Sequence, residues 1–305
     1  MRTKERTIVM DIMIQDKTDD SASPLTSKRV LTTVGIILGS LGCFLLASRI
    51  GGMICRTTGI SGYKAEFLCS LISLSLYTTI LTLLHKTKVL YTKGNGFFGG
   101  LISGFLMIYA SITSVINALF LETSDDGKIK LVTPTGLHFG SEQVWCIIGL
   151  LFAAGICEEL LFRGIIFNVL RDLFGRNSTK GTIAAIFTSG ILFGLYHLLN
   201  LTAGVSVDAV IPQVISTAGV GIFLCAVYAR WGNIWITVFL HAFMDICVVL
   251  PTSMKNNASI VESINSTMSD PRKYLGVAVY VILALYLLRE EKRPQMFTYS
   301  VSDDR

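Results

Sequence analysis

Long apolar stretches are the feature of this sequence that most limits its fold. A helix that crosses the hydrocarbon core of a bilayer needs ~20 mostly apolar residues. About eight stretches of the chain meet this requirement, at residues 30–48, 65–84, 97–121, 143–170, 182–201, 212–229, 233–251 and 274–288. The sequence therefore predicts an all-α polytopic membrane bundle of about eight transmembrane helices.

Composition and charge agree with a membrane protein. Only 15% of the 305 residues are charged, against about 25% in ordinary soluble domains. The net charge of +5 could suggest a nucleic-acid partner, but basic residues in membrane proteins follow the positive-inside rule. We therefore expect the lipid bilayer as a partner and no nucleic acid. With the N-terminus inside, the inner segments carry roughly twice as many Lys and Arg as the outer ones. This predicts a multi-pass cell-membrane protein with both termini in the cytoplasm.

The fourth apolar stretch holds three ionisable residues, Glu158, Glu159 and Arg163. Such groups cost about 2.5–3.5 kcal/mol each at the bilayer centre on insertion scales, so they usually pair or function. Glu159 and Arg163 are four residues apart and can pair on one helix face. Glu158 is rotated by about 100° from Glu159 and needs a partner on another helix. A desolvated carboxylate of this kind suits a general base. The alternative is a structural ion network that ties helices together.

Two later apolar stretches each carry a histidine. Phe193 precedes His197 by one helical turn, so the aromatic ring can pack on the imidazole and hold its orientation. Alternatively, a backbone carbonyl could satisfy His197, or the side chain could lie at the outer interface beside Tyr196. His241 and Asp245 share a helix face, a spacing that suits metal ligation or a carboxylate orienting an imidazole. A simple helix-stabilising pair is the other interpretation.

These three motifs, in this order on successive membrane helices, resemble the CAAX protease and bacteriocin-processing (CPBP, or Abi) family of intramembrane endopeptidases. The resemblance covers roughly residues 143–250. It is carried by Glu158-Glu159…Arg163, Phe193…His197 and His241…Asp245.

The resemblance implies a catalytic core in helices four to seven, with a role for each motif residue. Glu158 would activate a water that His197 helps to position and deprotonate. His241 and Asp245 would stabilise the oxyanion of the tetrahedral intermediate. Structural support of the site would come from the remaining motif residues, Glu159, Arg163 and Phe193.

Two aspects of this site stay open in the sequence. An ionised Asp245 cannot donate to an oxyanion, so it must be protonated, orient His241 or ligate a metal. The family resemblance favours a glutamic endopeptidase without a cofactor. The alternative is a zinc-dependent membrane protease of the same fold, with Glu158, His197 and His241 as ligands. Counting along straight helices also places His197 nearer the outer end of its helix than Glu158 and His241 are in theirs.

The domain organisation follows from these assignments. We expect a disordered cytoplasmic tail at 1–28, N-terminal membrane helices at 29–142 and the catalytic core at 143–251. An external loop, the last helix and a cytoplasmic tail would occupy 252–305. The sequence further predicts a turn-rich connection at 122–142 and Pro212 in the first turn of the sixth helix. The seven scattered cysteines do not predict a disulfide framework.

The predicted substrates are membrane-associated peptides. They could be prenylated C-terminal motifs, bacteriocin or pheromone precursors, or signal-peptide remnants. Three other functions compete with this one. Ser61 lies in a Gly-x-Ser-Gly tetrad like that of rhomboid serine proteases, but the tetrad is better explained as a turn. A non-enzymatic bacteriocin-immunity or scaffold protein would keep the fold without activity. A proton-relaying transporter would require repeats and broken helix pairs, which the sequence does not clearly show.

Overall fold

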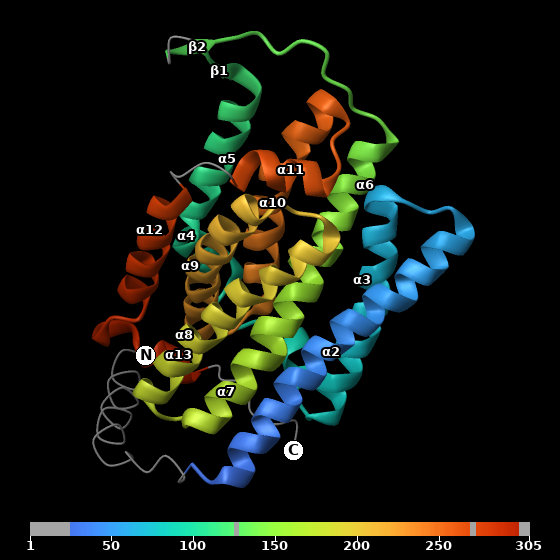
Figure 1. The fold of residues 1–305 in the computed structure, drawn as a ribbon. Coiled ribbons are helices and arrows are strands. Elements are labelled where there is room, and N and C mark those ends of the chain that lie inside the picture. The colour runs from blue at the N-terminus through green and yellow to red at the C-terminus, as the bar shows by residue number, and fades with distance from the viewer. Residues whose placement is uncertain (1–24, 125–127, 269–272, 299–305) are drawn as a thin grey trace.

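The protein is described by a computed structural model, which covers residues 25–124, 128–268 and 273–298. The predicted all-α membrane bundle is confirmed. Within the described ranges six helices are long and apolar enough to cross a membrane, or seven if one bent pair counts as a span. The six are α2 (Ser27–Thr58), α3 (Gly62–Leu83), the helix Ser141–Phe174, the helix Thr179–Ala203, α9 (Val207–Trp231) and α10 (Ile234–Asn256) (Figure 1).

Two of these spans change their helical geometry along their length. The span Ser141–Phe174 consists of α6 (Ser141–Leu150), two π-helical segments, η2 (Leu151–Glu158) and η3 (Leu160–Ile166), and α7 (Phe167–Phe174). The span Thr179–Ala203 consists of α8 (Thr179–Tyr196) and a 3-10 segment, η4 (His197–Ala203). Each change falls at residues that the sequence singled out, and π-helical turns occur frequently at functional sites.

The third and eighth predicted stretches are not single full-length helices. The third is a bent pair, α4 (Phe97–Ser103) and α5 (Phe105–Phe120), with a 64° angle between them. The break falls at Gly104, where an added Cβ would lie 2.5 Å from Leu240 of α10, so the bend packs directly on that helix. The eighth stretch forms α12 (Lys273–Leu287), whose apolar part is shorter than the other spans.

Helix ends differ from the predicted boundaries at two places. α2 continues well past residue 48 and ends at Thr58, and the φ of 73° at the following Gly59 suits a glycine at a helix C-terminus. The prediction that Pro212 occupies the first turn of the sixth helix is wrong. α9 begins at Val207, so Pro212 lies inside the helix. Its missing N–H leaves the Asp208 carbonyl without the usual helical donor.

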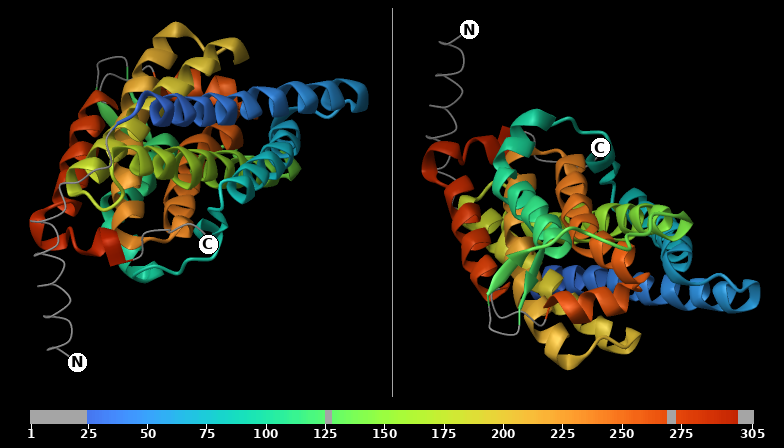
Figure 2. Two further views of the ribbon diagram at one scale, coloured as in Figure 1. Left: turned by 90° about the horizontal axis from the view of Figure 1, so that it is seen from below. Right: turned by 90° about the horizontal axis from the view of Figure 1, so that it is seen from above.

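The connecting segments contain short elements. The predicted turn-rich connection forms a hairpin of β1 (Leu121–Thr123) and β2 (Ile129–Leu131), with Leu121 paired to Leu131. α11 (Ile260–Met268) lies within the predicted external loop. The remaining short helices are η1 (Thr87–Leu90), η5 (Glu290–Lys292) and α13 (Gln295–Thr298). The hairpin and α11 lie at one end of the bundle, while α2 begins and α13 ends at the other (Figures 1 and 2). Of the predicted tail at 1–28, residues 1–24 lie outside the described residues.

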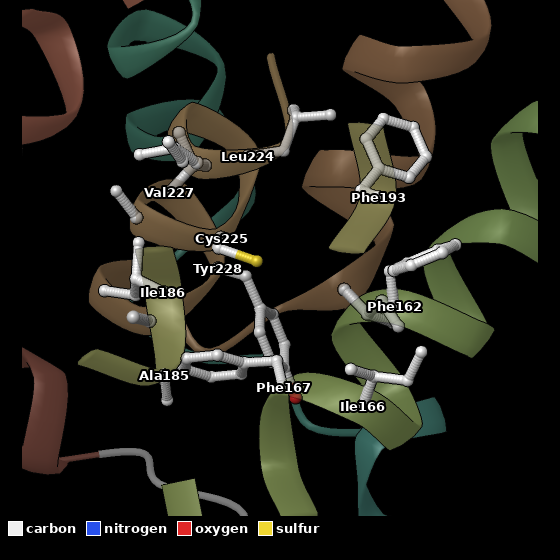
Figure 3. Packing of buried hydrophobic residues seen from close by; sticks show 14 of the residues in the cluster. Phe162, Ile166, Phe167, Ala185, Ile186, Phe193, Leu224, Cys225, Val227 and Tyr228 are labelled. Carbon is white, nitrogen blue, oxygen red and sulfur yellow. The ribbon is translucent and has the colours of Figure 1, made fainter. Parts of the chain in front are cut away.

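The core lies where the fourth, fifth and sixth spans meet (Figure 3). α8 and α9 approach closely because small residues line their contact. An added Cβ at Gly190 would lie 2.5 Å from the backbone nitrogen of Ile222, and one at Gly194 would lie 2.5 Å from the carbonyl oxygen of Val214. Gly190 and Gly194 form the small-xxx-small pattern that permits such approach in membranes. Around this contact pack the fully buried aromatic side chains Phe162, Phe167, Phe193 and Phe223.

Candidate active site

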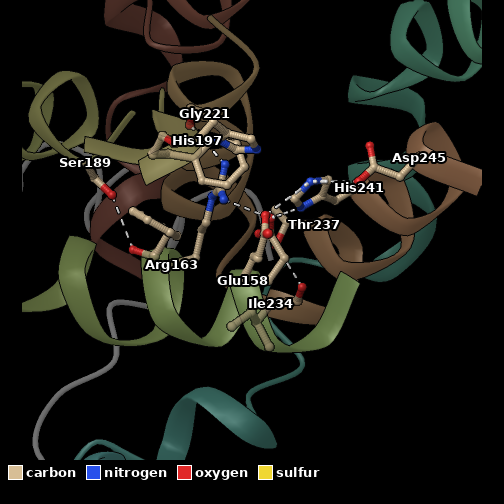
Figure 4. A network of polar contacts seen from close by, with 12 residues as sticks. Glu158, Arg163, Ser189, His197, Gly221, Ile234, Thr237, His241 and Asp245 are labelled. Carbon is tan, nitrogen blue, oxygen red and sulfur yellow. Dashed lines mark hydrogen bonds and ion pairs between the residues drawn. The ribbon is translucent and has the colours of Figure 1, made fainter. Parts of the chain in front are cut away.

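The predicted pair on the fourth span is confirmed. Arg163 Nη1 lies 2.9 Å from Glu159 Oε1, and neither side chain is exposed. Arg163 also donates through Nη2 to the carbonyl of Gly221 in α9, at 3.3 Å. The guanidinium is therefore held by a carboxylate from its own helix and a backbone oxygen from another (Figure 4).

Side chains satisfy carbonyls of the π-helical segment around this pair. The amide of Asn168 donates to the carbonyls of Arg163 and Gly164, each at 2.9 Å. The hydroxyl of Ser189 in α8 donates to the carbonyl of Phe162, at 3.3 Å. Buried carbonyls in lipid need such donors, so these contacts stabilise the unusual backbone geometry that carries the glutamates.

His241 contacts both glutamates through different nitrogens. Its Nδ1 lies 2.8 Å from Glu159 Oε1, within hydrogen-bond distance. Its Nε2 lies 3.9 Å from Glu158 Oε2 and 3.7 Å from Asp245 Oδ2. Because an ionised carboxylate only accepts, Nδ1 carries the hydrogen that points to Glu159. The carboxylate that orients His241 is therefore Glu159, while Asp245 faces the opposite nitrogen.

His197 is oriented by a backbone carbonyl, which was one of the two alternatives for this residue. α8 ends at Tyr196, and the backbone N–H of His197 bonds to the carbonyls of Gly194 and Leu195. The carbonyl of Phe193, the usual partner of that N–H in an α-helix, instead lies 2.9 Å from His197 Nδ1. A carbonyl only accepts, so Nδ1 is the protonated nitrogen and Nε2 carries the lone pair.

Phe193 contacts both imidazoles and the guanidinium. Its ring meets His197 edge to face at 4.9 Å between centroids, and meets His241 in the same way at 5.5 Å. Arg163 Cζ lies 4.7 Å from the centre of the ring. The sequence predicted the packing on His197. The structure adds His241 and Arg163, which makes Phe193 the shared support of three site residues.

Contacts along the helices show where α8 and α10 cross the fourth span. α8 passes the fourth span at Ser189, next to Phe162. α10 passes it at Ile234, which an added Cβ at Gly164 would contact at 3.7 Å. Both histidines follow these crossing points by about two helical turns. α8 starts at Thr179, well before it crosses the fourth span at Ser189. α10 instead starts at Ile234, the residue at which it crosses that span. Both imidazoles contact the ring of Phe193, so His197 and His241 lie close to one level of the bundle.

Exposure divides the site into a closed and an open side. Glu159 and Arg163 are fully buried and His241 is 2% exposed. The side chains of Glu158 and Asp245 are 19% and 29% exposed. A substrate or water can therefore meet Glu158 and Asp245, whereas Glu159 and Arg163 act only through their neighbours. Among the polar contacts of the described residues, Glu158 reaches His241 and none joins it to His197.

The predicted zinc ligands are not gathered into one cluster in the described structure. In the part of the chain that the structure describes, no three His, Cys, Asp or Glu side chains are grouped so that they could hold a metal ion. The proposed zinc set of Glu158, His197 and His241 is therefore not assembled as a ligand sphere, since structural and catalytic zinc sites need at least three protein ligands.

Several residues of the site have no motif in the sequence. Thr217 of α9 lies 3.3 Å from His197 Nδ1, and nothing in the sequence marks it. Thr237 precedes His241 by one turn, and its hydroxyl donates to the carbonyl of Ile234. The four-residue spacing of Gly190 and Gly194 is visible in the sequence and indicates a close helix contact. The sequence interpretation did not use it to predict the contact between α8 and α9. Ser61 lies in the turn before α3, as predicted, at the N-terminal end of that helix.

Fold and site together define a multi-pass membrane protein with carboxylates and histidines assembled inside the bundle. Residues 140–247 match the family model described as Rce1-like, type II CAAX prenyl endopeptidase Rce1-like. This match agrees with the resemblance drawn from the motifs: the segment is similar to CAAX-type intramembrane endopeptidases. No curated protein matches the chain.

Proposed function

We propose that the protein is a glutamic intramembrane endopeptidase that hydrolyses peptide bonds of membrane-associated substrates. The observation that carries the proposal is the division between the two glutamates. Glu159 is buried against Arg163 and His241, which leaves the partly exposed Glu158 beside His241 Nε2. A partly exposed carboxylate beside a fixed imidazole is suited to activating a water.

The chemistry follows from these positions. Glu158 takes a proton from water, with His197 Nε2 accepting the other hydrogen of that water as a hydrogen bond. The oxygen attacks the scissile carbonyl carbon, and the carbonyl oxygen becomes an oxyanion. His241, as an imidazolium, donates Nε2–H to that oxyanion, and the surrounding Glu159 and Asp245 balance its charge. The proton on Glu158 then passes to the amide nitrogen as the C–N bond breaks, giving a carboxylic acid and an amine and restoring the Glu158 carboxylate.

The remaining site residues act through these groups. Glu159 and Arg163 hold His241 and each other, and Phe193 fixes the planes of both imidazoles. Asp245 lies 3.7 Å from His241 Nε2, so it serves as a counter-charge at the nitrogen that faces the substrate.

The substrate class proposed first is a prenylated C-terminal peptide, in line with the description of the matched family. Bacteriocin or pheromone precursors and signal-peptide remnants are the other peptides that a membrane-embedded site could receive. The protein is proposed to lie in the cell membrane with both termini in the cytoplasm. α2 begins and α13 ends at the same end of the bundle (Figure 1). This arrangement supports an even number of membrane crossings between the two.

Purified full-length protein in lipid nanodiscs tests the activity. A farnesylated peptide ending in a Cys-a-a-X motif is the first probe, and mass spectrometry detects the released tripeptide. Glu158→Gln is expected to abolish cleavage while the protein remains folded, whereas Ser61→Ala is expected to cleave at the wild-type rate. Comparing peptides from a knockout strain with those of the wild type then tests the precursor substrates. Equal cleavage by wild type and Glu158→Gln would overturn the proposal in favour of a non-enzymatic role.

A further inference from the structure

The Nδ1 atom of His197 faces two oxygens. The carbonyl of Phe193 lies at 2.9 Å and the hydroxyl of Thr217 at 3.3 Å. The hydroxyl hydrogen of Thr217 points elsewhere, because Thr217 donates to the carbonyl of Gln213 at 2.7 Å. Toward His197, Thr217 can therefore act only as an acceptor.

Local helix geometry creates the first of these acceptors. At His197 the chain tightens from an α-helix into the 3-10 segment η4, and its backbone N–H bonds to Gly194 and Leu195. This shift releases the Phe193 carbonyl, which would otherwise be paired inside the helix. The imidazole of His197 then satisfies the carbonyl that its own backbone has released.

The close contact of α8 and α9 supplies the second acceptor. At Gly194 an added Cβ would lie 2.7 Å from Cβ of Ala218, next to Thr217 in α9. A bond from Asn200 Nδ2 to Gln213 Oε1, at 2.9 Å, ties η4 to the same turn of α9. Thr217 is thus held beside His197 by contacts on both sides of the imidazole.

From this arrangement we propose that Thr217 is a positioning residue for His197. Together with the Phe193 carbonyl, it holds the imidazole as the Nδ1–H tautomer and turns the Nε2 lone pair toward the reacting water. The inference rests on the proposed function, in which His197 Nε2 accepts a hydrogen from that water. It adds a residue that lies on α9, outside the three motifs.

The tautomer can be measured without any proteolysis. Full-length protein with ¹⁵N-labelled histidine is placed in nanodiscs, with His85 and His138 replaced by Asn to simplify the spectrum. Loss of signals in His197→Gln assigns the residue. In the wild-type site we expect Nδ1 protonated and Nε2 unprotonated. Thr217→Val is expected to give a mixture of the two tautomers, and Thr217→Ser to restore the single one.

Cleavage kinetics of the farnesylated peptide provide the second readout. Thr217→Val is expected to lower kcat about tenfold, the size of one lost buried hydrogen bond, with KM unchanged and the acid limb of the pH–rate profile displaced. Ser216→Ala is the matched control, because Ser216 donates to the same Gln213 carbonyl at 3.1 Å but has no contact with His197 in the described structure. It is expected to match the wild type in both measurements.

The outcomes separate the two proposals. A single Nδ1–H tautomer in Thr217→Val, with kcat unchanged, overturns the role of Thr217 and leaves the proposed function standing. An Nε2–H tautomer of His197 in the wild-type protein also overturns the role of Thr217. Cleavage that survives Glu158→Gln overturns the proposed function, whatever the tautomer of His197.

Discussion

His241 Nδ1 lies 2.8 Å from Glu159 Oε1, the same carboxylate oxygen that lies 2.9 Å from Arg163 Nη1. One oxygen therefore joins a guanidinium on its own helix to an imidazole on α10. Glu159 is thus more than the partner of Arg163. It links the fourth span to the seventh and decides which nitrogen of His241 faces Glu158.

Replacement of Glu159 should destabilise the protein more than replacement of Glu158. Glu159→Gln removes the only carboxylate within ion-pair distance of the buried Arg163 in the described structure. Breaking a buried pair from one side costs about 3–5 kcal/mol. Thermal unfolding in nanodiscs is therefore expected to show a clear drop in Tm for Glu159→Gln and little change for Glu158→Gln. Combining Glu159→Gln with Arg163→Met should recover part of the loss, and equal destabilisation by the two single Gln variants would contradict the division of roles.

The predictions that succeeded concern neighbours along one helix. The pairing of Glu159 with Arg163 and the packing of Phe193 on His197 follow from four-residue spacing, which is a local property of a helix. The π-helical turns of η2 and η3 leave this spacing on one face. The all-α membrane bundle likewise follows from lengths that the bilayer thickness dictates, although six or seven described helices qualify as spans where about eight were predicted.

The parts that the sequence did not predict depend on how helices cross. The positions of His197 and His241 along the bundle depend on where α8 and α10 cross the fourth span, which only the contacts at Ser189 and Ile234 reveal. Thr217 faces His197 because Gly194 lets α9 approach. The tightening at His197 is equally hidden, because no Gly or Pro lies at the helix end to indicate it.

Phe193→Leu should impair catalysis by loosening both imidazoles. The ring makes edge-to-face contacts with His197 and His241, and such contacts contribute about 0.5–1.5 kcal/mol each. We expect kcat to fall roughly tenfold or more in the farnesyl-peptide assay. Phe67→Leu is the control, because Phe67 contacts only aromatic rings outside the site, those of Trp145 and Phe152, among the ring contacts of the described residues. Equal losses in the two variants would show that Phe193 is a general packing residue.

Gly194→Ala should separate α8 from α9. Its Cβ would lie 2.5 Å from the Val214 carbonyl oxygen, so one backbone must move. Overpacking of this kind costs about 1–3 kcal/mol and would lengthen the contact between His197 and Thr217. Both a lower Tm and a lower kcat are expected. Gly42→Ala in α2, where no atom lies within 4 Å of the added Cβ, should leave both quantities unchanged.

Substitutions at Asp245 distinguish its possible roles. Asp245→Asn keeps the shape and exchanges the counter-charge for an N–H that can donate to the oxyanion in its place, so cleavage is expected to remain within a few-fold of the wild-type rate. Asp245→Leu removes both carboxylate oxygens of this side chain from beside His241 Nε2 and should lower kcat about 10²-fold or more. Inactivity of Asp245→Asn would show instead that the negative charge itself is required.

Removal of metal ions should leave cleavage unchanged. The described residues contain no group of three donors that could hold an ion, and the proposed reaction uses Glu158 directly as the base. Treatment with 1,10-phenanthroline followed by gel filtration is therefore expected to preserve kcat on the farnesylated peptide, and elemental analysis of active protein should find well under one zinc per chain.

The zinc alternative predicts the reverse. Chelation would abolish cleavage, added Zn²⁺ would restore it, and Glu158→Gln, His197→Gln and His241→Gln would each lower the zinc content. Measuring zinc in these three variants beside Asp245→Asn separates loss of a ligand from loss of a catalytic group.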